Sequence, residues 1–75
     1  MTTAERDADE LVELANSSVG VSDGLVRLGQ IFDAYMIETP GSFVEKRKAL
    51  LDAFRAKAPD GELTSLIADK LGDVP

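Results

Sequence analysis

The polar side chains available for chemistry in this 75-residue sequence are carboxylates, amides, hydroxyls, ammonium groups and guanidinium groups, because it contains no Cys and no His. Thiol nucleophiles, imidazole bases, disulfides and structural zinc sites are therefore excluded. Catalysis by a pair of carboxylates has little support, since the acidic residues fall on faces expected to be exposed and no pattern indicates a concave pocket. We expect a protein that is not an enzyme and has no catalytic, cofactor-binding or metal-binding residues.

The densest positive charge is the run Lys46, Arg47 and Lys48, which follows the turn-forming residues 39–41. A basic helix after a tight turn is typical of helix-turn-helix proteins, whose second helix binds DNA. Residues 42–58 carry five basic and two acidic side chains, a local charge of +3. However, the run winds around the helix instead of forming one stripe, and the net charge of -6 disfavours nucleic-acid binding. DNA binding therefore stays an alternative function.

Arg47 falls in the middle of the apolar stripe of residues 42–58. Its side chain is expected either to lie along the core with its charge in water, or to pair with a carboxylate of residues 4–18 or of a partner. If the segment does not bind nucleic acid, its basic side chains are expected to form a solvated face that balances the acidic residues 4–18. These opposite charges could meet within one molecule or between two.

The densest negative charge lies near the start of the sequence, where Glu5, Asp9 and Glu13 recur one helical turn apart. Their spacing of about 5 to 6 Å is near that of phosphates along a nucleic-acid strand. A second alternative function is therefore an inhibitor that mimics nucleic acid and occupies the site of a nucleic-acid-binding protein. Acidic side chains at a helix N-terminus also solvate the helix and stabilise its dipole without any partner.

Four predicted helices position these residues, because apolar residues recur with the helical period between turn-forming Gly, Pro, Asn and Ser residues. Capping boxes of Thr2 with Glu5 and of Ser42 with Glu45 mark two of the starts. The predicted helices comprise residues 4–18, 22–38, 42–58 and 62–71, with Val74 extending the apolar face of the last. Connections of about three residues favour antiparallel neighbours. The predicted fold is all-α, a compact bundle of four short helices joined by tight turns, in a single helical domain of residues 1–75.

The segment of residues 25–37 is apolar over more of its surface than a single core-facing stripe requires. At about 100° per residue, one face comprises Leu25, Leu28, Phe32, Tyr35 and Met36. Val26 and Ile37 fall on one flank of that face and Ile31 falls on the other. We therefore expect this second helix to be the most enclosed, covered by the rest of the chain or by a second molecule. Gly29 lies mid-helix, where Gly costs about 1 kcal/mol relative to Ala, and predicts close approach of another helix there.

These features favour a small non-enzymatic protein-protein interaction module, such as an adaptor, assembly factor or inhibitor of a larger cytoplasmic or phage-encoded machine. The expected partner is another protein, either a second copy in a homo-oligomer or a larger complex. The candidate partner-binding residues are Val26, Ile31, Ile37, Lys46, Arg47 and Lys48, and the candidate acidic face comprises Glu5, Asp9 and Glu13. The sequence shows no signal peptide and no apolar run of the ~20 residues that a membrane span needs, so we expect a cytoplasmic protein without membrane contact.

Overall fold

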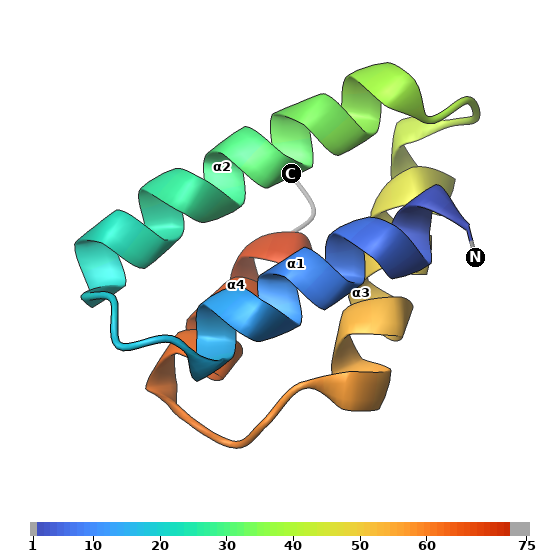
Figure 1. Ribbon diagram of the computed structural model, residues 1–75. Coiled ribbons are helices and arrows are strands. Elements are labelled where there is room, and N and C mark those ends of the chain that lie inside the picture. The colour runs from blue at the N-terminus through green and yellow to red at the C-terminus, as the bar shows by residue number, and fades with distance from the viewer. Residues whose placement is uncertain (1, 73–75) are drawn as a thin grey trace.

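Four α-helices make up the structure, a computed structural model that describes residues 2–72 (Figure 1). They are α1 (Thr3–Asn16), α2 (Val21–Glu38), α3 (Phe43–Lys57) and α4 (Glu62–Gly72). The predicted all-α bundle of four short helices joined by tight turns is confirmed. The predicted boundaries differ from the observed ones only near the helix ends, and Val74 lies outside the described residues.

The predicted capping residues Thr2 and Ser42 start α1 and α3, and the full capping box forms at Thr2, whereas at Ser42 one of its two bonds is observed. The Thr2 hydroxyl accepts a hydrogen bond from the backbone N–H of Glu5 at 3.1 Å, and Glu5 Oε1 accepts one from the backbone N–H of Thr2 at 3.3 Å. The Ser42 hydroxyl accepts a hydrogen bond from the backbone N–H of Glu45 at 3.2 Å. These bonds satisfy N–H groups that have no partner within the helix. Gly41 makes the turn before α3 with a φ of +116°, which L side chains rarely adopt.

The core lies between the four helices and is built from Leu, Ile, Ala and two aromatic side chains. Its members are Ala8, Leu11, Leu14, Leu28, Ile31, Tyr35, Leu50, Phe54, Ile67 and Leu71. The most extensive helix-helix contact is between α1 and α3. Ala8, a small residue of α1, is almost fully buried in the core.

The expectation that the second helix would be the most enclosed is not met, because α1 and α3 each make more contacts within the bundle than α2 does. In Figure 1, α2 runs along one side of the bundle. Its outward face alternates the apolar Val26 and Ile37 with the polar Gln30 and Asp33, and all four side chains are exposed. The other three helices cover one side of α2, whereas the sequence had indicated that three of its sides would be covered.

The close approach predicted at Gly29 occurs instead at Gly24. A Cβ atom at Gly24 would lie 2.9 Å from Leu63 Cδ1, so the absence of a side chain allows α4 to contact the first turn of α2. At Gly29 a Cβ atom would have no neighbour within 4 Å among residues 2–72. Within that part of the chain, Gly29 therefore weakens the middle of α2 without a packing reason.

Candidate functional site

Lys46, the first residue of the basic run, holds the C-terminal end of α2. Its Nζ donates hydrogen bonds to the backbone carbonyls of Met36 at 2.7 Å and Thr39 at 2.9 Å. The last carbonyls of a helix have no partner within the helix and carry partial negative charge, so a lysine ammonium stabilises them. Lys46 is thus engaged within the molecule.

Arg47 performs the same role at the end of α4. Its side chain is only 7% exposed, and Nη1 donates a hydrogen bond to the backbone carbonyl of Leu71 at 3.1 Å. The guanidinium carbon lies 5.9 Å from the centre of the Phe43 ring, a cation-π distance, while Nε has no hydrogen-bond partner within residues 2–72. Neither of the two predicted environments is observed, because the charge is buried and its bonded partner is a backbone carbonyl.

Lys48 is the exposed member of the run. The three consecutive basic residues therefore do not form a common surface, since Lys46 and Arg47 bind the ends of two different helices. A helix-turn-helix protein needs an array of free basic side chains for phosphate contacts. Of the three residues in the run, Lys48 is therefore the one whose side chain is free to contact a phosphate.

The predicted acidic face is also partly engaged within the molecule. Glu5 belongs to the capping box of α1, and Asp9 Oδ1 lies 3.0 Å from Lys57 Nζ of α3. Glu13 is exposed. The Asp9–Lys57 pair shows that the acidic first helix and the basic third helix meet within one molecule. Such exposed pairs contribute little to stability, about 0 to 1 kcal/mol each.

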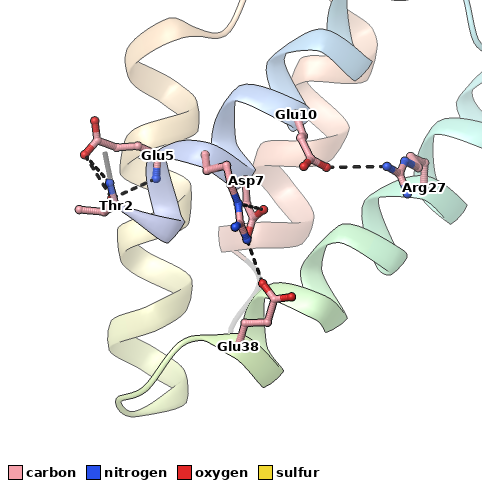
Figure 2. Close-up of polar contacts among 7 residues, drawn as sticks. Thr2, Glu5, Asp7, Glu10, Arg27 and Glu38 are labelled. Atoms are coloured by element: carbon pink, nitrogen blue, oxygen red, sulfur yellow. Dashed lines mark hydrogen bonds and ion pairs between the residues drawn. The ribbon is translucent and has the colours of Figure 1, made fainter.

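A polar cluster that the sequence analysis missed lies where the start of α1 meets the end of α2. Arg6 Nη2 lies 2.8 Å from Glu38 Oε2, and Arg6 Nε lies 3.5 Å from Asp7 Oδ1. Figure 2 shows Asp7 and Glu38 beside each other and the Glu10–Arg27 pair, 3.7 Å apart, further along the same two helices. Two pairs of oppositely charged side chains, Arg6–Glu38 and Glu10–Arg27, therefore join α1 to α2.

Asp7 is the unusual member of this cluster, because the residue is only 5% exposed and its Oδ2 has no hydrogen-bond partner among the described residues. Burial raises the pKa of Asp7 above its ordinary value; the neighbouring Arg6 opposes this shift and the Glu10 carboxylate adds to it. Burial, and the Asp7 charge, also raise the pKa of Tyr35. The sequence could have indicated the burial of Asp7, because its helical spacing places it on the same face of α1 as Leu11 and Leu14.

We expect Asp7→Asn to stabilise the protein near pH 7. Because the raised pKa means that the folded state binds this proton more tightly than the unfolded chain does, the ionised carboxylate destabilises the fold above that pKa. The free energy of unfolding should rise by about 1 kcal/mol, typical for relief of an unsatisfied buried group. The gain should disappear as the pH falls through the raised pKa toward the ordinary value of about 3.9.

Urea denaturation of the two proteins near pH 7 and near pH 3 measures this difference. The exposed Asp33→Asn is the matched control and should change the free energy of unfolding little at either pH. A lower stability of Asp7→Asn near pH 7 would show that the pairing of Asp7 with Arg6 outweighs the cost of burial.

The three apolar candidates for partner binding divide into surface and core. Val26 is 64% exposed and Ile37 is 85% exposed, whereas Ile31 is buried in the core. Ile31 lies on the flank of α2 that faces α1, and it is therefore not available to a partner. Phe43 and Val44, at the start of α3, are also exposed apolar side chains.

A shallow apolar groove lies between α2 and α4, with a volume of about 250 Å³. It is lined by Leu25, Leu28, Gly29, Phe32, Lys70 and Leu71. Sequence analysis assigned the α2 members of this set to the core face, and the helical spacing of an apolar stripe cannot show that α4 covers only part of it. Lys70, in the last turn of α4, is the charged member of the lining.

No protein-family model, no curated protein and no solved structure matches this chain. The structure itself is therefore the guide to function. Within residues 2–72, no three His, Cys, Asp or Glu side chains lie close enough together to hold a metal ion. Among the described helices, none has the length and apolar character needed to cross a membrane.

Proposed function

We propose that this protein is a small non-enzymatic interaction module that binds another protein through exposed apolar side chains of α2, as an adaptor, assembly factor or inhibitor of a larger assembly. The observation that carries the proposal is the exposure of Val26 and Ile37, three turns apart on one face of a helix. Single exposed apolar residues are common, but two of them on one helix face favour a contact surface. The cytoplasm is the proposed compartment.

The charges of the molecule favour this surface over the two alternatives. DNA binding through α3 has less support, because Lys46 and Arg47 are bonded to backbone carbonyls of α2 and α4. Mimicry of nucleic acid has less support, because Glu5 and Asp9 already have partners in the molecule. The exposed apolar residues of α2 have no such internal role.

The test is the introduction of charge at the two exposed positions, as Val26→Asp and Ile37→Asp. Each variant should keep the helical circular-dichroism signal and a melting temperature near that of the wild type, since neither side chain is in the core. Self-association, measured by light scattering over a concentration series, or co-purification of a defined partner should fall at least tenfold, about 1.4 kcal/mol.

The matched control is Ala34→Asp, which adds the same charge at another exposed position of α2. It should leave self-association and co-purification unchanged. If Val26→Asp and Ile37→Asp retain every interaction of the wild type, the proposed surface is wrong. If they unfold the protein, these residues are covered in solution and belong to a larger core.

A further inference from the structure

The dipeptide Asp-Gly occurs twice in the chain, in two different surroundings. Asp23 and Gly24 lie near the start of α2, whereas Asp60 and Gly61 lie in the connection between α3 and α4. Figure 1 shows this connection as a loop at the lower edge of the molecule. An Asp-Gly dipeptide can react with itself, because Gly has no side chain to hinder attack of its nitrogen on the Asp carboxyl group. The surrounding structure decides whether the two groups can meet.

Asp60 and Gly61 are held by few contacts. Both residues are exposed. Among the hydrogen bonds and ion pairs within residues 2–72, none involves the Asp60 carboxylate or the Gly61 N–H. A Cβ atom at Gly61 would meet none of the described atoms within 4 Å. The Asp60 carboxyl group and the Gly61 nitrogen are therefore free to approach each other.

Asp23 and Gly24 are held in place by the helix. The Gly24 N–H donates a hydrogen bond to the carbonyl of Gly20 at 2.8 Å, and Gly24 is buried beside Leu63 of α4. Ring closure between Asp23 and Gly24 would require a rotation of the Asp23 backbone out of its helical conformation. It would also break the hydrogen bond to Gly20. The structure therefore protects this second dipeptide.

We propose that Asp60 is a site of spontaneous covalent modification, at which the chain rearranges through a succinimide to an isoaspartyl linkage that weakens the start of α4. In the first step the Gly61 nitrogen attacks Cγ of the Asp60 carboxylic acid. The N–Cγ bond forms, the C–OH bond breaks, and the hydroxyl leaves as water with the proton of the Gly61 N–H. In the second step water adds to the main-chain carbonyl carbon of Asp60, and the bond from that carbon to nitrogen breaks. The chain then runs through Cγ, and water is the only co-reactant.

The new linkage lies directly before the first turn of α4. The Gly61 carbonyl accepts hydrogen bonds from the backbone N–H of Ser65 at 3.1 Å and from the Ser65 hydroxyl at 3.2 Å. Rearrangement adds one methylene group to the backbone before Gly61 and converts the former main-chain carbonyl of Asp60 into a carboxylate. The added rotatable bond gives Gly61 more conformational freedom. Its hydrogen bonds to Ser65 should therefore be weakened.

The experiment ages the full chain near pH 7, folded in buffer and unfolded in concentrated urea, and measures isoaspartate at each site by peptide mapping with mass spectrometry. In the folded protein, Asp60 should rearrange at a rate within about threefold of its rate in urea. Asp23 should rearrange at least about tenfold more slowly when folded than in urea. In urea the two sites should react alike, because the helix that protects Asp23 is lost.

Three substitutions sharpen the comparison. Asp60→Asn and Asp23→Asn form a matched pair, because an amide closes the same ring with loss of ammonia and the change in mass reports the reaction directly. In the folded protein, Asp60→Asn should deamidate at least about tenfold faster than Asp23→Asn. Asp60→Glu should abolish rearrangement at this position, because its longer side chain closes the smaller ring no longer.

Equal rates at Asp60 and Asp23 in the folded protein would overturn the proposal. So would a rate at Asp60 that is at least about tenfold lower in the folded protein than in urea. The rearranged form, separated by reversed-phase chromatography and returned to buffer, should show faster hydrogen exchange at the Ser65 amide than the unmodified form. Unchanged exchange there would overturn the proposed weakening of α4.

Discussion

Phe54→Ala should lower the free energy of unfolding by about 3 to 5 kcal/mol. Phe54 belongs to α3 and is fully buried. α3 and α1 make the most extensive helix-helix contact of the bundle. Removal of a buried Phe side chain costs about 3 to 5 kcal/mol, through lost burial and the cavity that remains. A domain of this size has a total stability of about 4 to 11 kcal/mol, so one substitution removes much of it. Thermal and urea denaturation followed by circular dichroism measure the loss.

The matched control is Ile37→Ala, which truncates a large apolar side chain of α2 that is 85% exposed. Its effect on the free energy of unfolding should stay within about 0.5 kcal/mol. Equal losses from Phe54→Ala and Ile37→Ala would contradict the assignment of Ile37 to the surface. They would instead indicate that Ile37 is buried against another molecule under the conditions of the measurement.

Arg47→Glu should destabilise the fold by about 3 to 5 kcal/mol, the range found when one member of a buried charged interaction is lost. The substitution removes the hydrogen bond to the carbonyl of Leu71 and places a carboxylate beside that partly negative oxygen. Since the side chain is 7% exposed, water cannot compensate the new charge. Urea denaturation measures the change in the free energy of unfolding.

Lys48→Glu is the control for this experiment, because it makes the same charge reversal at the next residue, on the exposed side of α3. Its effect should be within about 0.5 kcal/mol. If both variants are equally stable, Arg47 has no structural role, and the basic run regains its interpretation as a binding surface. A much larger loss of stability in Arg47→Glu than in Lys48→Glu would support the observation that Arg47 binds a helix end while Lys48 faces solvent.

The helices and their starts were predictable from the sequence because their signals are local. The hydroxyls of Thr2 and Ser42 lie three residues before the groups they bond, and Pro and Gly interrupt the chain between the helices. The exposure of Val26 and Ile37 was foreseen only as one of two outcomes, since apolar spacing shows which residues share a face but not whether a neighbour covers it.

The partners of Lys46 and Arg47 could not be predicted, because both bind backbone carbonyls and every residue has one. A sequence pattern reveals opposite charges at matching spacing, yet it cannot show which helix end lies within reach of a long basic side chain. The wrong prediction for Gly29 has a similar cause. α2 contains two glycines, and close approach was predicted only at Gly29, whereas the tertiary position of Leu63 brings it to Gly24.

The extensive packing of α1 against α3 also bears on how the chain folds as it is made. Chains leave the ribosome from the N-terminus, so α1 and α2 emerge before α3. The apolar side of α1 has its largest contact only after α3 has followed. Until α3 has been made, Leu11 and its neighbours therefore lack the largest part of the surface that covers them in the folded protein.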